Sequence, residues 1–343
     1  MRSTLRLSLL ASLSILPLAT PVVAQSSAAD GAEEQVIIVT GTRRTDRTVA
    51  DSTVPIDVIS AEALQSSGTT ETNRLLNNLV PSFNFPQPSL TDGTDSLRPA
   101  TLRGLAPDQV LVLVNGKRRH LSSLLNLNGS VGRGSAGVDM NTIPSLAIER
   151  IEVLRDGASS QYGSDAIAGV INVQLKKRGA NKAQASFGKY VTTMKGVGEV
   201  ATVAPTLTGS DDPAITFTGQ DRTRRDGDTY TFATNLSLPV GESGYVNWTA
   251  EYRDRSPTNR SGPDIRRQYV NAGDPRETTI SRYLHRFGDG MSKDLNFFLN
   301  AGAELGNGFE LYGFGSYGYR DANGAGFYRR ANDARNKDWA NGG

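Results

Sequence analysis

Side chains that could carry out catalysis are scarce in this chain of 343 residues. It contains no cysteine, which excludes disulfides and thiolate metal sites and is compatible with an oxidising envelope compartment. Its two histidines, His120 and His285, lie far apart in the sequence, and neither has a cluster of ligand-type residues beside it. No nucleophile–base set is evident. We therefore expect no enzyme, no metal site and no cofactor.

Two glycine-rich stretches share only the spacing of nucleotide-binding loops. The stretch NGSVGRGSAG, in residues 128–137, lacks the Gly-Lys-Ser/Thr ending and the strand-to-helix context of a phosphate loop. Residues 313–318, GFGSYG, fit G-x-G-x-x-G but lie inside an alternating strand pattern and open no helix. The net charge of +2 gives no bulk electrostatic preference for nucleic acid. We expect neither a nucleotide nor a nucleic acid as partner.

The first 24 residues have the pattern of a secretory signal peptide. Arg2 and Arg6 form a basic start, residues 7–18 are an apolar run, and small residues through Ala24 precede a cleavage point. The run is shorter than the roughly 20 residues that a membrane-spanning helix needs. No later segment approaches such a helix, so residence in a membrane would require β-structure. The sequence predicts export.

Residues 25–53 are predicted to be a flexible segment that carries one isolated β-prone run. The run consists of Val36, Ile37, Ile38, Val39 and Thr40. One interpretation is a short edge strand of the domain that follows. The other is a segment that is mobile at rest and pairs with a strand of another protein, with main-chain hydrogen bonds supplying affinity.

Residues 54–178 are predicted to form one compact mixed α/β domain. The apolar run VLVLV, residues 110–114, predicts a central strand buried on both faces. Asn115-Gly116 after it is a hairpin signal. We expect strands at residues 54–59, 97–105, 109–115, 148–154 and 170–175, and helices at residues 60–66 and 69–79.

The pattern changes after residue 178, where stretches alternate between apolar and polar residues. They cover residues 230–238, 246–252, 295–305 and 309–319. Lengths of about 9–11 residues suit tilted membrane-spanning strands. Residues 239–244 and 306–308 make short connections, and residues 189–227 and 253–293 make long ones, as in outer-membrane barrels. A soluble β-sandwich would also alternate and is the alternative.

Three blocks of this sequence resemble TonB-dependent outer-membrane receptors. They are IPSLAIERIEVLRDGASSQYGSDAIAGVINV within residues 140–177, LRGLAPDQVLVLVNGKRR at residues 102–119, and EEQVIIVTGTRR at residues 33–44. The resemblance covers roughly residues 33–178. It implies an α+β plug domain, with a mixed sheet and short helices, at residues 54–178. Antiparallel transmembrane β-barrel strands would follow at residues 179–343. We count about five strands against about 22 in plugged transporters, so the barrel is expected to be incomplete.

The resemblance also implies a function and partners. It suggests a receptor for energised uptake of a scarce nutrient, such as a ferric siderophore, a vitamin or an oligosaccharide, in which the plug gates the barrel. Periplasmic TonB, acting with inner-membrane energy-transducing proteins, would grip residues 36–40. The other partners would be outer-membrane lipid and a small-molecule or oligomeric ligand. A passive outer-membrane channel or a ligand-binding surface β protein is the alternative.

Two sets of site residues follow from the resemblance. Buried plug arginines in the family pair with barrel carboxylates, and the candidates for such a plug latch are Arg103, Arg150 and Arg155, with Glu149 and Glu152 beside them. Ordinary strand-face charges are the alternative. Ligand is expected at the external loops, roughly residues 86–96 and 121–137. The candidates for ligand contact are Gln87, Asp92, Arg119, His120, Asn128 and Arg133.

Overall fold

The computed structural model describes residues 55–66, 71–84, 86–91, 93–97, 99–127, 129–155, 158–205, 212–330 and 333. The predicted signal peptide and the predicted TonB-binding run at residues 36–40 lie outside these ranges, as do Asp92 and Asn128. Among the helices in the described ranges, none combines the length and the apolar character needed to cross a bilayer.

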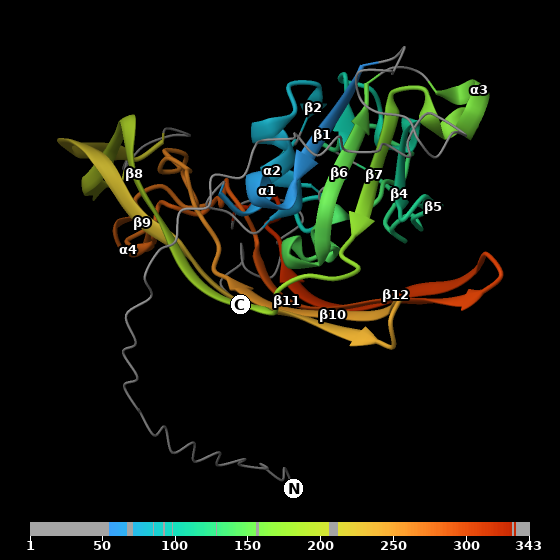
Figure 1. Ribbon diagram of the computed structural model, residues 1–343. Helices are drawn as coiled ribbons and strands as arrows, with labels where there is room; N and C mark the ends of the chain where they lie inside the picture. The colour runs from blue at the N-terminus through green and yellow to red at the C-terminus, as the bar shows by residue number, and fades with distance from the viewer. Residues whose placement is uncertain are drawn as a thin grey trace, which may run out of the picture. The chain divides into compact units, whose positions relative to one another are not determined.

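A five-stranded mixed sheet forms the centre of the α/β domain, in the order β1-β6-β7-β4-β5 (Figure 1). Its strands are β1 (Ile56–Ser60), β6 (Ile148–Leu154), β7 (Gly169–Leu175), β4 (Val110–Val114) and β5 (Lys117–Arg118). Strands β4 and β7 are parallel and the other neighbours are antiparallel. All of β4 is buried, which confirms the predicted central strand. Asn115 (φ 47°) and Gly116 (φ 73°) make the predicted hairpin turn between β4 and β5.

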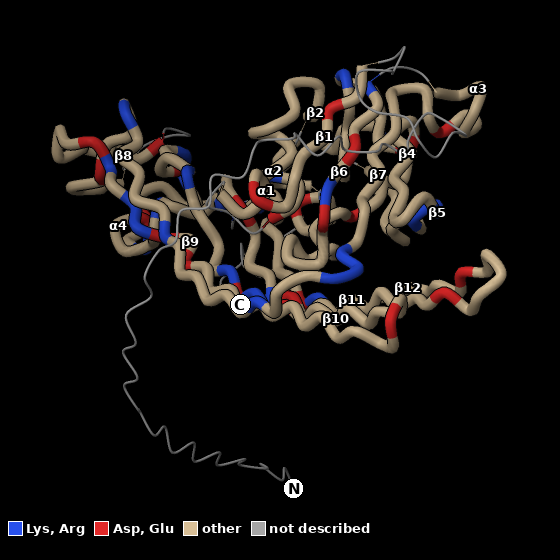
Figure 2. Tube along the Cα trace, viewed as in Figure 1, with Lys and Arg blue, Asp and Glu red and all other residues tan. Residues whose placement is uncertain are grey.

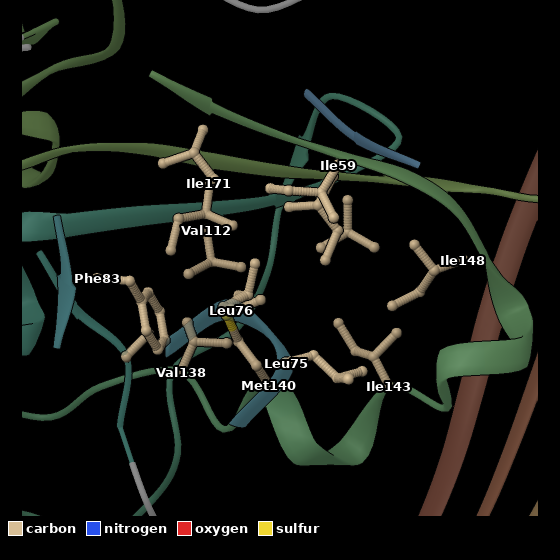
Figure 3. Close-up of a cluster of buried hydrophobic side chains, with 14 of the residues drawn as sticks. Ile59, Leu75, Leu76, Phe83, Val112, Val138, Met140, Ile143, Ile148 and Ile171 are labelled. Atoms are coloured by element: carbon tan, nitrogen blue, oxygen red, sulfur yellow. The ribbon is translucent and has the colours of Figure 1, made fainter. Parts of the chain in front are cut away.

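Short helices pack their apolar side chains onto this sheet. The helices are α1 (Ala61–Ser66), α2 (Thr72–Leu79) and α3 (Ser159–Tyr162), with 3₁₀ turns η1 (Pro107–Gln109), η2 (Met140–Thr142), η3 (Ser145–Ala147) and η4 (Ser164–Ala166). Figure 3 shows the resulting core. Leu75 and Leu76 of α2 are fully buried, together with Met140 of η2 and Ile171 of β7. The core therefore joins segments from both ends of the domain.

The predicted strand at residues 97–105 is wrong over most of its length. Only β3 (Thr101–Leu102) is extended there, and it pairs with β2 (Phe83–Asn84). Pro99 has no N–H to donate to a ladder. Arg103 (φ 56°) and Gly104 (φ 73°) adopt left-handed backbone conformations that end the strand.

The second sheet is antiparallel and contains five strands in sequence order, β12-β11-β10-β9-β8 (Figure 1). They are β8 (Lys182–Ala204), β9 (Ala214–Val240), β10 (Gly244–Arg255), β11 (Met291–Gly306) and β12 (Phe309–Asn323). All four predicted alternating stretches fall within β9 to β12, which confirms them. The long connection between β10 and β11 contains only α4 (Arg276–Thr279).

The prediction of a long loop at residues 189–227 is wrong, because β8 and β9 continue through it as a hairpin. This part of the sequence is rich in Thr, Arg, Asp and Gly, and it lacks a sustained apolar period. Main-chain pairing in a long hairpin does not depend on such a period, so no hydrophobic signal marks it.

The two faces of the antiparallel sheet are reversed relative to a soluble protein. On β9 the apolar Phe232 and Leu238 are 55% and 57% exposed, whereas the polar Thr231 and Asn235 are each 1% exposed. Aromatic contacts run across the apolar face, with ring centroids 6.1 Å apart for Trp248 and Phe297. A soluble sandwich buries its apolar face. The arrangement therefore contradicts that alternative and has the apolar-out, polar-in pattern of membrane strands.

Gly169 at the start of β7 tests how tightly the mixed sheet is packed. Its φ is 141°, and an added Cβ would lie 2.3 Å from the carbonyl oxygen of Leu154. We expect Gly169→Ala to lower the free energy of unfolding by more than the roughly 1–3 kcal/mol of backbone strain alone, because the clash adds to the strain. Gly104→Ala is the control, since its φ is 73° but its Cβ would meet no atom within 4 Å. Equal losses in urea unfolding would contradict this packing.

Candidate functional site between the two sheets

Two segments distant in sequence form one polar face of the α/β domain. One is the start of α2, which carries Glu71 and Arg74, and the other is η2 with Asp139 before it. They are bound together, because the Thr72 hydroxyl donates to the Ile143 carbonyl over 2.9 Å and the Asn73 N–H donates to Asn141 Oδ1 over 3.2 Å. This face contacts the polar face of the antiparallel sheet.

The first contact is a charge cluster at the start of α2. Arg255 of β10 donates to the Glu71 carboxylate, and both residues are buried. Arg74 lies 2.5 Å from Glu71 and 2.5 Å from Asp289, which precedes β11. Burial lowers the pKa of Arg74, but the carboxylates of Glu71 and Asp289 outweigh burial and raise this pKa above its ordinary value. The charges in the cluster therefore neutralise one another across the two sheets.

The second contact is centred on Arg320 of β12. Its guanidinium lies 2.5 Å from Asp139 of the α/β domain, donates to Asp294 of β11, and donates to the Ser96 carbonyl over 3.1 Å. Arg253 of β10 continues the cluster. It lies 3.4 Å from Asp294 and donates to the Asn141 carbonyl over 3.3 Å. Arg320 and Arg253 thus connect both sheets through charged groups.

Hydrogen bonds to neutral groups support these clusters further along the sheet. The Asn300 amide of β11 donates to the Lys176 carbonyl over 2.9 Å, and Asn115 donates to Asn300 over 3.2 Å. Arg178 donates to the carbonyl of Glu242, in the turn between β9 and β10, and to that of Gly244, the first residue of β10. The α/β domain therefore contacts the antiparallel sheet at several positions along its strands.

The predicted latch residues make contacts within the α/β domain. Arg150 lies 3.0 Å from Glu152 and 3.8 Å from Glu149. Arg155 lies 3.0 Å from Asp57, and Arg103 donates to the Arg155 carbonyl over 3.2 Å. Their role as a latch to barrel carboxylates stays a prediction.

The residues that do bridge the two sheets were missed by the sequence reasoning. The set is Glu71, Arg74, Asp139, Arg253, Arg255, Asp294 and Arg320. One signal could have indicated part of this set. Arg253 and Arg255 continue the polar face of the alternating pattern in β10, the face that turns inward. No local signal marks Glu71 or Asp139, because only the tertiary fold brings them together.

The predicted ligand loops lie against each other. The Thr94 and Ser130 hydroxyls are 2.5 Å apart, joining residues 93–97 to the second loop. That second loop is closed by its own backbone bonds, from the Ser122 N–H to the Gly137 carbonyl and from the Asn126 N–H to the Ser135 carbonyl. It exposes apolar side chains, namely Leu121, Leu125, Leu127 and Val131. The two loops therefore form one ordered surface.

The ligand candidates divide between three places in this region. Gln87 is exposed and lines a hollow of about 240 Å³ between the two loops. Arg119 and His120 line another of about 410 Å³ between the α/β domain and strands β11 and β12. Arg133 is exposed on the second loop. Asp92 and Asn128 lie outside the described residues.

The segment of residues 256–290 is joined to β9 by an ion pair and to β8 by a hydrogen bond from the Tyr283 hydroxyl to Glu199. Figure 2 shows acidic and basic positions interspersed around α4. Arg282 and Glu277 form a buried pair at 2.6 Å, and Arg260 lies 2.9 Å from Asp226 of β9. The Arg222 guanidinium of β9 stacks 3.3 Å from the ring centroid of Tyr283. The connection between β10 and β11 is thus fixed to the neighbouring hairpin.

The α/β domain is thus joined by charge clusters to the polar face of a sheet whose other face is apolar. Residues 48–170 match the family model described as TonB-dependent Receptor Plug Domain. The chain therefore carries the plug domain of the TonB-dependent receptors, and strands β8 to β12 follow it. This confirms the predicted family and the predicted fold class.

Individual relatives agree with this family. The probable TonB-dependent siderophore receptor PirA of Acinetobacter baumannii is 37% identical over 98 residues, which cover 29% of this chain and 13% of the relative. The vitamin B12 transporter BtuB of Vibrio cholerae is 30% identical over 151 residues, covering 44% of this chain and 22% of the relative.

The fold also matches a solved structure. A crystal structure of a mutant ferric enterobactin receptor from Pseudomonas aeruginosa superposes with a TM-score of 0.51 at 16% identity, covering 79% of this chain and 33% of that one. At this identity the likeness concerns the fold alone. The chain matches about a third or less of the length of these three proteins.

The plug–sheet clusters predict unequal effects of the same substitution at two sites. Glu71→Gln leaves Arg255 buried without its carboxylate, and we expect a loss of about 3–5 kcal/mol in the free energy of unfolding. Glu310→Gln is the control, because Glu310 pairs with Lys177 at 3.5 Å in a half-exposed position. That surface pair should contribute about 0–1 kcal/mol. Urea unfolding in detergent measures both, and a Glu71→Gln loss no larger than the control would contradict the buried cluster.

His120 gives a second prediction, on its protonation. Burial lowers the pKa of His120, and the neighbouring Arg119 lowers it further. We expect an NMR titration midpoint below about 6.5, the usual value for a free histidine, and a higher midpoint in Arg119→Gln. Because the folded-state pKa is the lower one, the stability from neutral His120 is complete above about pH 6.5 and is lost as the pH falls.

The two histidines of the chain make this measurement direct. His285→Gln leaves one imidazole signal and assigns it. A midpoint unchanged by Arg119→Gln would show that Arg119 does not act on His120.

Proposed function

We propose that this protein is an outer-membrane receptor of a Gram-negative cell that imports a scarce nutrient with energy delivered by TonB. It is a transporter and not an enzyme. The observation that carries the proposal is the plug domain at residues 48–170, joined by charge clusters to the polar face of strands whose apolar face is exposed. A passive channel has no use for a domain fixed in this way. Residues 1–24 would direct export, and lipid would contact the apolar face.

The topology suggests how a pull on the N-terminal segment would act. The proposed TonB-binding run, residues 36–40, precedes β1, the first described strand. Strand β1 lies at the edge of the mixed sheet and pairs with β6 alone within the described residues. Pulling would therefore peel β1 from one neighbour before it reaches α2 and the Glu71–Arg255 pair. Because the outer membrane holds no ATP, inner-membrane proteins would supply the work through TonB.

We infer that ligand binds the surface formed by the two plug loops. Gln87, Arg119, His120 and Arg133 are the described candidates for contact, with Asp92 and Asn128 as further ones. Two relatives are named as a siderophore receptor and a vitamin B12 transporter. These names support a ferric siderophore or a vitamin as the nutrient, and an oligosaccharide is the third candidate.

The proposal is tested by placing a proline in the predicted run. Ile38→Pro removes a main-chain donor from the strand that would pair with TonB. The nutrient is first identified by growing cells that depend on the receptor with a ferric siderophore, a vitamin or an oligosaccharide as the limiting source. We expect Ile38→Pro to reduce its uptake to the level of cells lacking TonB while surface binding is retained.

Ala28→Pro, in the preceding flexible segment, is the matched control and should leave uptake unchanged. Uptake that survives Ile38→Pro would favour the passive channel instead.

A further inference from the structure

We propose that Arg119 binds anionic groups of the transported ligand between the plug and strands β11 and β12, at the middle of those strands. The ligand class is then one that carries carboxylate, phosphate or ionised phenolate oxygens. This inference rests on the proposed function and deepens it. The shared chemistry is an oxyanion that a planar guanidinium can bind through two parallel hydrogen bonds.

The position of Arg119 is fixed by both sheets. Its backbone N–H donates to the Val112 carbonyl of the buried strand β4 over 2.9 Å. Its guanidinium lies 5.5 Å from the ring centroid of Phe298 and donates to the Ser316 hydroxyl over 3.0 Å. Phe298 and Ser316 are partners in the ladder of β11 and β12, and Ser316 is the central residue of β12. Arg119 therefore stands half-way along the strands.

Arg119 differs from the other arginines between the plug and the sheet. Arg74, Arg255 and Arg320 each have a carboxylate within ion-pair distance. In the part of the chain that the structure describes, the side-chain partners of Arg119 are the hydroxyls of Ser316 and, at 3.5 Å, Thr142. These bonds use two of the five N–H donors of a guanidinium.

The electrostatics agree with this contrast. Burial lowers the pKa of Arg119, and the opposing effect of Asp139 does not compensate for it. Asp139 is itself bound to Arg320 at 2.5 Å. The positive charge of Arg119 is thus only weakly balanced by the described protein groups, and an incoming anion would balance it.

The surroundings of Arg119 suit an oxyanion. The hollow of about 410 Å³ is within the size range of small-ligand sites. Ser122, Ser123 and Asn296 bring hydroxyl and amide donors to its lining, and Leu97 and Leu121 bring apolar surface. Asp139 and Asp294 also line it, and both carboxylates are bound to Arg320. Among the described residues, Arg119 is therefore the lining guanidinium that has no carboxylate within ion-pair distance.

A purely structural role is the competing explanation, since Arg119 could fasten the plug through Phe298 and Ser316. Three variants separate the two roles. Arg119→Gln removes the charge and Arg119→Lys keeps it. Arg118→Gln is the matched control, because it removes an exposed plug arginine that is paired with Asp165. Thermal unfolding without added anion reports on fastening. Binding of the anion reports on the proposed site.

The experiment uses the whole chain in detergent with inorganic phosphate as the probe in calorimetry, and selenate in crystals. We expect phosphate to bind about tenfold or more weakly to Arg119→Gln, with Arg119→Lys intermediate and Arg118→Gln unchanged. We expect the selenium anomalous signal beside the Arg119 guanidinium to disappear in Arg119→Gln. The proposal is overturned if the unsubstituted protein shows no selenium signal beside Arg119. It is also overturned if the signal and the phosphate affinity persist in Arg119→Gln, because the anion is then an adventitious ion only.

The same variants separate this inference from the proposed function. If Ile38→Pro abolishes uptake but Arg119→Gln leaves both phosphate affinity and uptake unchanged, the receptor function stands and the anion site fails. If Arg119→Gln loses phosphate binding while Ile38→Pro leaves uptake intact, the site stands and TonB-dependent transport fails.

Discussion

Charge pairing across the interface between the plug and the strands is the interaction on which this structure depends. Glu71 and Asp139 come from the plug, and Arg255 and Arg320 come from the sheet. A buried pair contributes little over a well-packed apolar contact, yet the loss of one partner is costly because the other charge stays buried. Such an interface specifies one position of the plug against the sheet, and it is destabilised strongly when one partner of a pair is lost. That combination suits the proposed function, in which a pull through TonB would release a plug that is otherwise held firmly.

The antiparallel sheet turns its polar face toward the plug, and this makes the interface possible. An inward face made of Thr, Asn, Glu and Arg cannot form a hydrophobic core, so it needs polar partners. The plug provides them with side chains such as Glu71 and Asp139 and with backbone carbonyls such as those of Asn141 and Lys176. Its apolar core lies around Leu75 and Ile171, and Phe298 of β11 belongs to the same cluster. The plug therefore meets the sheet through these polar groups and through the apolar contact of Phe298.

The strands of the mixed sheet would resist the proposed pull on the N-terminal segment to different degrees. Strand β1 is at a sheet edge, whereas β4, β6 and β7 each have two neighbours or a fully buried position. The charge clusters begin at Glu71, directly after the first strand and helix. A pull from the N-terminal side would meet a single ladder first and the buried charges next. The loops that form the predicted ligand surface are attached elsewhere, with Asp95 accepting from the Ala325 N–H and Ser96 from Arg320.

The sequence by itself determined the family, the order of the two parts and most of the strands. The apolar run at residues 110–114 and the alternation in β9 to β12 are local signals, because side-chain period follows directly from strand geometry. Local signals failed where pairing carries no hydrophobic period, as in the long β8–β9 hairpin, and where Arg103 and Gly104 end β3 early. Only the tertiary structure decided which charges meet. Glu71 and Arg255 are separated by 184 residues, and an ion pair at that separation leaves no mark on the residues beside either one.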